Sequence, residues 1–401
     1  MLSATANAEP FDWYADARAR APIVWEEEMS SWVVVSYEAV REICRLDNIG
    51  FRRKDAEQGS EYDVISGGRR NVKVLTGEQH AKLHSWMMSA FTPAKASGLQ
   101  ESIVRDVVRQ LIDRLSGKNT AELKSELLDQ IPIRVVAAVL DLPWDDDDWV
   151  EQATDKVQRI FNFYGKRGYH DATDVEDARL AHVEMRALMD PVLTARSDGS
   201  GADLISRFFA AGPEILDDWN IEDVYINTMS FFLGGAHTST LVLASAFYLM
   251  LTDQALLARM RECDDKTLRA FVEQVLRLHP PQQFTQRRVI DDIEICGVQL
   301  RKGDLITLAV GATNRDESHY PRPDEIDFEQ RNQRDHLTFL AGPHACVGQG
   351  LARAEIVETV RQVLARFADI RLNPEALEPP RYQGLIMRGY SPLHVVYRLA
   401  S

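Results

Sequence analysis

The sequence predicts a mainly α-helical fold with a smaller β-rich part, forming one large domain over residues 1–401 around a long central helix. Apolar residues recur at helical spacing through most of the chain between residues 77 and 251. Short strand-like runs with glycine turns follow Pro281. No internal repeat and no low-complexity linker divides the chain, which favours one domain over two.

The charge and the cysteines exclude several classes of protein. A formal net charge of −15 argues against partners such as nucleic acid or an anionic membrane surface. The four cysteines show no C-x-x-C spacing, so neither a disulfide framework nor a zinc site is indicated. The first residues lack the apolar run of a signal peptide, and we expect a cytoplasmic protein.

The N-terminal part predicts a hairpin and then a helix. The stretch "IVWEEEMSSWVVVS" (residues 23–36) has two short apolar runs around a polar turn, which is typical of a hairpin. Ser36 is a favourable N-cap for the following "YEAVREICRL", and an acid lies in the first turn of that helix.

The middle of the chain predicts helices over residues 99–117, 175–197 and 221–251. The part from Ser230 to Leu251 is long enough to span a bilayer and carries no formal charge except the one that His237 can take. Its acidic flank and its polar centre, "GGAHTST", favour a buried central helix over a membrane span.

The C-terminal third changes from helix to strand and back. A helix over residues 265–279 is ended by Pro280 and Pro281, and strands with turns at Gly297 and Gly303 follow within residues 286–310. A last helix over residues 348–367 precedes strands at 370–372 and 393–399.

The last helix is entered by "FLAGPHACVGQGLARAE" (residues 339–355), the strongest chemical signal in the chain. Its glycines bound a loop around Cys346, directly before a helix N-terminus whose unsatisfied backbone N–H groups stabilise a thiolate. Glycine lets the backbone approach a flat ligand, and Phe339 can cover the sulfur. The alternative is a buried cysteine in a tight loop.

The spacing F-x-x-G-x-H-x-C-x-G resembles the haem-ligand signature of the cytochrome P-450 superfamily. It comprises Phe339, Gly342, His344, Cys346 and Gly348. The resemblance implies the P-450 fold and haem b as cofactor, with Cys346 as the thiolate ligand of the haem iron and His344 on a haem propionate.

Further matches extend the resemblance over nearly the whole chain. They are "EQHAKLHSWMMSAFTP", "FTQRRVIDDIEICG", "ATNRDESHYPRPDEIDF" and "GLIMRGYSP". By this resemblance His80 and Arg287 contact haem propionates. The family's His-x-x-x-Arg pair is His80 and His84 here, and a propionate contact from a histidine is shorter and depends on pH.

The helix before Pro280 departs from the family. The family carries Glu-x-x-Arg at this point, whereas this chain has Gln274-x-x-Arg277. An uncompensated buried arginine costs several kcal/mol, so we expect a substitute acid. Glu325 is the expected partner of Arg277, and Glu273 is its rival.

The stretch "GGAHT" (residues 234–238) takes the place of the family's small-Gly-x-acid-Thr pattern on the helix that binds oxygen. Thr238 can bond the carbonyl of Gly234 and open a polar notch for dioxygen. His237 replaces the acid, and we expect it to border the notch and to handle protons or hold the substrate. The alternatives are a core histidine bonded to a neighbouring carbonyl, or an iron ligand.

Aromatic and basic side chains are interleaved in the regions that line family pockets, with Phe161, Lys166, Arg167 and Tyr169 among them. This pattern favours a planar aromatic substrate bearing carboxylates, although each aromatic could be core and each base solvated. The expected pocket residues are Phe231, Phe232, Leu233, Arg69, Arg70, Phe163, Tyr164, Phe284 and Ile386.

Three functions are consistent with the resemblance. The first is a monooxygenase of a small secondary-metabolite substrate, with a ferredoxin or flavodoxin type electron donor. The second is an oxidase that couples aromatic rings without oxygen insertion, as in indolocarbazole-type members, which His237 and the aromatic pocket favour somewhat. The third is a haem-thiolate sensor, disfavoured because the chain shows no signalling or DNA-binding segment.

Overall fold

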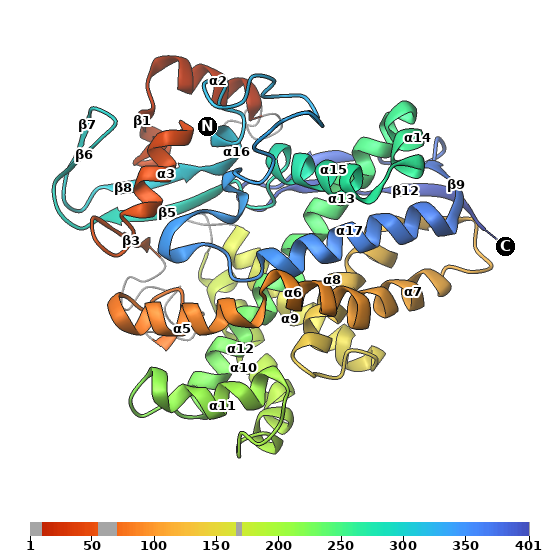
Figure 1. Cartoon of the computed structure of the whole chain (residues 1–401), viewed down its shortest axis with the longest axis horizontal. Helices are drawn as coiled ribbons and strands as arrows, with labels where there is room; N and C mark the ends of the chain where they lie inside the picture. Colours follow the sequence, from red (N-terminus) through yellow and green to blue (C-terminus); the bar gives the residue numbers. More distant parts are fainter. Residues whose placement is uncertain (1–9, 55–69, 166–170, 401) are drawn as a thin grey trace.

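The structure is a computed structural model that describes residues 10–54, 70–165 and 171–400. A helical body makes up most of the molecule, and a β-rich part lies at one end (Figure 1). This arrangement confirms the predicted fold class.

The β-rich part joins the N-terminus to strands far along the chain. Its five-stranded sheet has the order β1-β2-β8-β5-β3, in which β2 and β8 are parallel. Helix α3 begins after Ser36, whose side chain accepts a hydrogen bond from the Ala39 backbone N–H, as predicted. The elements are α2 (Phe11–Arg20), β1 (Ile23–Glu26), β2 (Ser31–Val34), α3 (Tyr37–Arg45), β3 (Phe51–Arg53), β5 (Phe284–Val289), β6 (Ile293–Ile295), β7 (Val298–Leu300), β8 (Leu305–Ala309) and α16 (Val310–Thr313).

The helical body is built from amphipathic helices whose apolar faces form one large core. Two π-helical segments, Gln100–Val104 and Lys124–Leu128, precede α7 and α8. The helices are α5 (Gly77–Ala90), α6 (Pro93–Leu99), α7 (Arg105–Asp113), α8 (Gln130–Val139), α9 (Asp147–Gly165), α10 (Ala172–Ala195), α11 (Leu204–Ile215), α14 (Gln254–Glu262) and α15 (Asp265–Leu278).

The predicted central helix is two helices, α12 (Ile221–Ala236) and α13 (Thr238–Thr252), separated at His237. The backbone of His237 leaves helical geometry, with φ −128° and ψ −35°. The whole stretch of 32 residues is long and apolar enough to cross a membrane, but 67% of its most apolar window is buried inside the molecule. It is therefore a core element.

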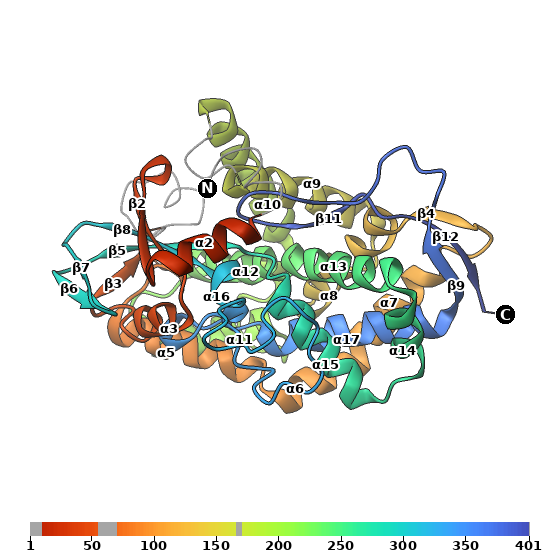
Figure 2. The same cartoon turned by 90° about the horizontal axis from the view of Figure 1, so that it is seen from above.

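The C-terminal elements complete the body. Helix α17 (Gln349–Arg366) packs on α13, so that α12 and α13 lie between α17 on one side and α9 and α10 on the other (Figure 2). The remaining strands are β4 (Thr120–Glu122), β9 (Phe367–Leu372), β10 (Arg381–Gln383), β11 (Gly389–Ser391) and β12 (His394–Leu399). The order β4-β12-β9 closes a second sheet beside the C-terminus.

Candidate functional site

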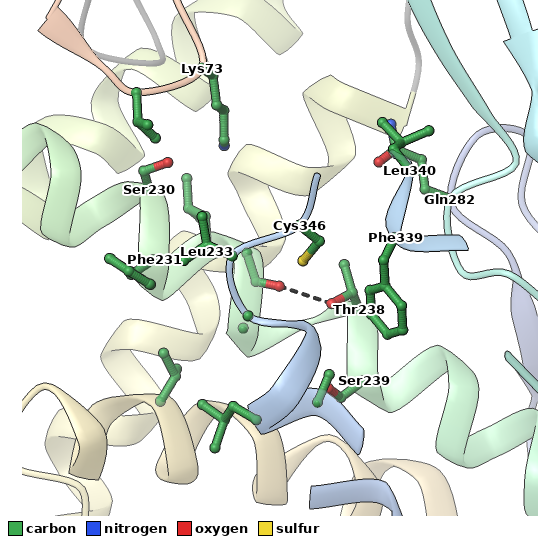
Figure 3. Close-up of a pocket in the computed structure, with 18 of the residues that line it drawn as sticks. Lys73, Ser230, Phe231, Leu233, Thr238, Ser239, Gln282, Phe339, Leu340 and Cys346 are labelled. Atoms are coloured by element: carbon green, nitrogen blue, oxygen red, sulfur yellow. Dashed lines mark hydrogen bonds between the residues drawn. The ribbon is translucent and has the colours of Figure 1, made fainter. Parts of the chain in front are cut away.

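A cavity of about 360 Å³ lies between the start of α17 and the junction of α12 and α13 (Figure 3). This volume falls within the ~300–1,000 Å³ typical of ligand pockets. Cys346 faces the cavity from the α17 side, and Gly234 and Thr238 face it from the other. Most other wall residues are apolar, which restricts water and strengthens electrostatic interactions inside.

The start of α17 prepares the Cys346 sulfur to carry negative charge. The backbone N–H groups of Gly348 and Gln349, in the first turn of the helix, favour negative charge on it. Burial raises the pKa of the Cys346 thiol, while these N–H groups and the Arg353 guanidinium act in the opposite direction. A metal ion on the sulfur would remove the remaining cost of the thiolate.

The cysteine loop is held from outside by close packing. Gly342 has a φ of +69°, and a Cβ added there would lie 2.1 Å from the carbonyl oxygen of Cys44 in α3. Glycine is therefore required at this position. Arg353 lies over the Phe339 ring, 4.4 Å from its centroid, and its Nε is 2.8 Å from Glu273 Oε1. These contacts fix the ring beside the cysteine.

The two glycines of the opposite wall have different roles. A Cβ added to Gly234 would meet nothing within 4 Å, so this residue leaves space open to the cavity. A Cβ on Gly235 would lie 2.9 Å from Val136 of α8, so this glycine allows close helix packing. Thr238 Oγ1 donates a hydrogen bond of 2.8 Å to the Gly234 carbonyl (Figure 3), and the predicted polar notch is present.

The structure does not place His237 where the sequence predicted. Its ring does not form part of the described cavity wall, and it lies against Phe161 of α9, with ring centroids 4.7 Å apart. Thr238, the first residue of α13, faces the cavity, whereas His237 lies at the break between α12 and α13 and turns toward α9. Burial, with a smaller effect from Lys124, lowers the pKa of His237 to about 4, so the ring is neutral at pH 7.

Three histidines lie close together, and two of them line the cavity. The rings of His80 and His344 have centroids 4.1 Å apart, and those of His80 and His84 are 5.2 Å apart. His84 and His344 line the cavity, and their Nε2 atoms contact the Ala345 carbonyl and Asn48 Oδ1 respectively. His80 Nε2 is buried without a hydrogen-bond partner among the described residues. Such an orphaned donor or acceptor indicates a missing polar ligand group.

Arg287 does not reach the cavity, contrary to the prediction. Its guanidinium is fully buried and pairs with Asp47, with Nε and Nη2 2.6 and 2.9 Å from the two carboxylate oxygens. Arg53, directly opposite Arg287 in the β3–β5 register, lines the cavity instead. No sequence signal identified Arg53, because a three-residue strand is too short to show periodicity.

Four of the nine expected pocket residues line the cavity: Phe231, Leu233, Tyr164 and Ile386. Phe163 and Phe232 do not, and both are fully buried in the core. Phe161 and Tyr164 share a helix face, whereas Phe163 points elsewhere. The Phe232 ring packs on Trp149 at 6.0 Å.

The other expected pocket residues also lie elsewhere. Phe284 packs edge-on against Tyr14 at 6.3 Å, and its neighbours Pro281 and Gln282 line the cavity instead. Arg70 is held by Asp223, with Nη2 2.9 Å from Oδ2. Arg69, Lys166, Arg167 and Tyr169 fall outside the described residues.

The predicted partner of Arg277 is wrong. The five N–H donors of Arg277 make five hydrogen bonds. Two go to Gln274 Oε1, and the others go to the backbone carbonyls of Asn314, Pro323 and Glu325. Neither the Glu325 nor the Glu273 carboxylate contacts it, and Glu273 instead pairs with Arg353, Arg334 and His336. Burial lowers the pKa of Arg277 to about 10.

Besides Arg53, two charged wall residues were not predicted from the sequence. The ammonium of Lys73 extends toward the cavity, and the Glu355 carboxyl lies in the wall formed by α17 (Figure 3 shows Lys73). Helical spacing places Glu355 on the same face as Gly348 and Leu351, but nothing in the sequence marks that face as open.

Together these features fit a flat ligand that carries a metal ion. Gly234 and Gly348 leave open space on opposite walls, a thiol faces the gap, and Arg53 and the histidines supply polar groups at one end. A soft sulfur ligand suits iron in a porphyrin, and the polar end suits the porphyrin's acid groups.

Comparison with known proteins identifies relatives. The cytochrome P-450 family model matches residues 174–393. The chain is 26% identical to the biotin biosynthesis cytochrome P-450 of Bacillus subtilis, over 93% of each chain. It is 26% identical to mycinamicin IV hydroxylase/epoxidase of Micromonospora griseorubida, covering 95% of this chain and 92% of that protein. A solved structure of P-450 BioI, in complex with an acyl carrier protein ligated to hexadec-9Z-enoic acid, shares the fold. It has a TM-score of 0.86 at 23% identity, covering 98% of this chain and 100% of that chain.

Proposed function

The chain belongs to the cytochrome P-450 family, a family of haem-dependent monooxygenases of small molecules, and we propose that Cys346 is the ligand of its haem iron. The observation that carries this proposal is the placement of the Cys346 thiol across one cavity from the Gly234–Thr238 notch. Haem b is the form of haem proposed, since the chain has no cysteine pair for covalent attachment of the C-x-x-C-H type.

The reaction proposed is substrate–H + O₂ + 2 electrons + 2 protons → substrate–OH + H₂O. When bound, haem supplies the redox chemistry that splits dioxygen. The protein positions the groups around it. The N–H groups of Gly348 and Gln349 stabilise the Cys346 thiolate, and Phe339 shields the sulfur from water.

The notch between Gly234 and Thr238 is proposed as the place where dioxygen and its protons are received. The Thr238 hydroxyl donates to the Gly234 carbonyl, so its oxygen remains able to accept a hydrogen bond from the cavity. Gly234 keeps the wall clear of side-chain atoms at this point. A hydrogen-bonding group beside open space can orient a small polar reactant.

We propose that His84, His344, Arg53 and His80 hold the haem propionates. The proposal is supported by the placement of Arg53, His84 and His344 in the cavity wall, and by the unpartnered Nε2 of His80, whose ring lies beside the other two histidines. In this proposal Arg287 positions Arg53 and does not contact the haem. Its pairing with Asp47 fixes the strand that lies opposite Arg53.

The proposed substrate is a small aromatic secondary metabolite that carries an acid group. Phe161, Tyr164 and Phe231 form aromatic parts of the wall, and Lys73 places a cation in the same wall. Aromatic rings stack on planar ligands, and a lysine ammonium favours a carboxylate in an apolar surrounding. One relative is named as a hydroxylase/epoxidase of mycinamicin IV.

The second candidate is oxidative coupling or ring closure of aromatic groups without oxygen insertion. The aromatic wall favours it, whereas the position of His237 behind Phe161 removes the other reason that the sequence offered. For either reaction we propose a ferredoxin or flavodoxin type protein as electron donor and a cytoplasmic location.

Two experiments test the proposal. The reduced protein under carbon monoxide should show the red-shifted Soret band of thiolate ligation, and Cys346→Ala should lose that band. A Cys346→Ala protein that kept it would refute the ligand assignment. With a substrate identified by the spectral shift it induces, turnover under labelled dioxygen should place the label in the product. A product of altered bonding without label would establish the coupling reaction instead.

A further inference from the structure

Helix α12 carries three polar residues on one face, although most of its side chains are buried. Asp223, Asn227 and Ser230 follow the spacing i, i+4, i+7, which places them on one side of a helix. Asp223 is 1% exposed, and Asn227 is fully buried. Buried polar groups are costly unless they are hydrogen-bonded, so this face requires partners from another part of the chain.

The partners are the consecutive residues Arg70, Asn71 and Val72. The Asn227 side-chain amide joins the outer two. Its Oδ1 accepts a hydrogen bond of 3.1 Å from the Val72 backbone N–H, and its Nδ2 donates one of 3.1 Å to the Arg70 carbonyl. Nδ2 also donates to the Asp223 carbonyl at 2.9 Å. The amide thus supplies the donor and the acceptor that a neighbouring β-strand would supply to this segment.

Asp223 and Ser230 hold the same segment on either side of Asn227. The Asp223 carboxylate pairs with the Arg70 guanidinium, with Oδ2 2.9 Å from Nη2. Ser230 Oγ lies 3.5 Å from Asn71 Oδ1, which is a long contact. Every residue from 70 to 72 is therefore attached to α12.

Lys73 is the next residue along the chain, and its position depends on this attachment. Its backbone N–H donates to Asn71 Oδ1 at 2.9 Å, in a turn that brings Val72, Lys73 and Val74 to the cavity wall. The Lys73 ammonium extends toward the cavity (Figure 3). Burial raises the pKa of the Cys346 thiol, and the Lys73 charge is among the effects that lower it, so this charge acts inside the cavity.

We propose that Asn227 and the Arg70–Asp223 pair are positioning residues for an acidic substrate, because they hold residues 70–72 so that the Lys73 ammonium meets the substrate carboxylate. This inference rests on the proposed function, which gives the substrate an acid group. Most of the cavity wall is apolar, and a carboxylate there is costly unless a cation pairs with it.

The consequence is a selectivity for charge. A lysine side chain is a flexible stem with a compact charge at its end, so a shift of the backbone that carries it changes where the ammonium can reach. If residues 70–72 come away from α12, a bound carboxylate loses its cation. A neutral ligand of the same shape loses no such partner, so its affinity should change little.

The test uses the haem-loaded protein and pairs of planar aromatic probes that differ in charge. The pairs are biphenylacetic acid with biphenylacetamide, and indoleacetic acid with indoleacetamide. Equilibrium dialysis gives the Kd of each probe without reliance on turnover or on a spectral change.

The variants separate the positioning residues from the cation. Asn227→Leu removes the amide, and Arg70→Gln removes the ion pair at a position whose side chain is 37% exposed. Lys73→Met removes the ammonium. Thr228→Val is the matched control, because Thr228 is fully buried on the same helix and its hydroxyl has no hydrogen-bond partner among the described residues.

We expect the wild type to bind each acid about tenfold more tightly than its amide, as one charge-assisted hydrogen bond allows. Lys73→Met should abolish this preference and keep the amide affinities and the haem content. Asn227→Leu and Arg70→Gln should each lower the preference to about threefold or less, with amide affinities within about twofold of the wild type. Thr228→Val should keep the full preference. Lys73→Glu should reverse it, so that biphenylethylamine binds more tightly than the acid.

The outcomes distinguish the inference from the proposed function. A preference that depends on Lys73 but stays complete in Asn227→Leu and Arg70→Gln would overturn the inference and leave the acid-bearing substrate standing. Equal affinities for acid and amide in the wild type would refute both the inference and that substrate class, whereas the carbon monoxide spectrum tests the haem-thiolate site independently. A loss of haem from Lys73→Met would assign the ammonium to a haem propionate and would also overturn the inference. Should Asn227→Leu not fold, Arg70→Gln alone decides, because its partly exposed side chain can be replaced without opening the core.

Discussion

Replacing Gln274 by leucine should destabilise the protein more than any exposed substitution on the same helix. Gln274 Oε1 accepts hydrogen bonds from Arg277 Nε at 3.2 Å, Arg277 Nη2 at 2.9 Å and the Asp327 backbone N–H at 3.2 Å. Leucine removes the acceptor and leaves two donors of a fully buried guanidinium unpaired. Loss of one partner from a buried charged group costs about 3–5 kcal/mol.

For a chain of 401 residues, about 4 kcal/mol corresponds to a fall in Tm of about 5 °C, from the usual entropy of unfolding per residue. Gln274→Glu should shift Tm upward by about 1–2 °C, because a carboxylate roughly doubles the strength of the two hydrogen bonds from Arg277. Its second oxygen takes the place of Gln274 Nε2, which donates to Gln330 Oε1 at 3.1 Å, and the Gln330 amide can rotate to donate instead.

Thermal unfolding of the haem-loaded variants at one scan rate provides the measurement. Gln330→Leu is the control, since it loses two hydrogen bonds of a half-buried neutral side chain, one with Gln274 and a long one to the Asn332 carbonyl, and should change Tm by about 2 °C or less. A Gln274→Leu protein as stable as this control would show that carbonyl oxygens alone satisfy Arg277. A Gln274→Glu protein less stable than Gln274→Leu would refute the electrostatic reasoning altogether.

Three further outcomes follow from the geometry. Gly342→Ala should cost about 3 kcal/mol and reduce haem content, measured by absorbance per protein, because its Cβ would overlap the Cys44 carbonyl at a positive φ. Thr238→Ala, which removes the bond to the Gly234 carbonyl, should keep the carbon monoxide spectrum and release more peroxide per NADH; an unchanged ratio would exclude a role for the hydroxyl. For His237 the folded pKa of about 4 lies below the ordinary value of 6.5, so the unfolded chain binds the proton first and stability falls as pH drops through this window. His237→Asn should therefore lose less Tm between pH 7 and pH 5 than the wild type, and an equal loss would contradict the assigned pKa.

The parts of the site that a short local motif encodes were predictable. The cysteine loop, the Thr238–Gly234 bond and the Ser36 cap each depend on residues within ten positions of one another, so spacing alone specifies them. The division of the central helix at His237 was not predicted, because two glycines signal a weak helix without locating the break.

The sequence-based predictions were wrong where the position of a residue depends on the direction of its side chain or on a partner distant in sequence. Phe163 and Phe232 have the expected chemistry but lie on the wrong helix faces, since one residue shifts direction by about 100°. The family pattern assigned Arg287 to a haem propionate and predicted a substitute acid for Arg277. Instead Asp47 pairs with Arg287, and three of the five hydrogen bonds of Arg277 go to backbone carbonyls more than 35 residues away in sequence. Such partners follow from tertiary packing.

The walls of the cavity come from residues as far apart as Arg53 and Met387. During synthesis the chain emerges N-terminus first, so most of the protein leaves the ribosome before the last wall residues are available. The cysteine loop also needs both ends of the chain, because Gly342 packs against Cys44 of α3, about 300 residues earlier in the sequence. Haem capture is therefore a late event in the life of each chain. Cells short of haem should accumulate a nearly complete fold with an open cavity, and proteases should attack the walls of that cavity first.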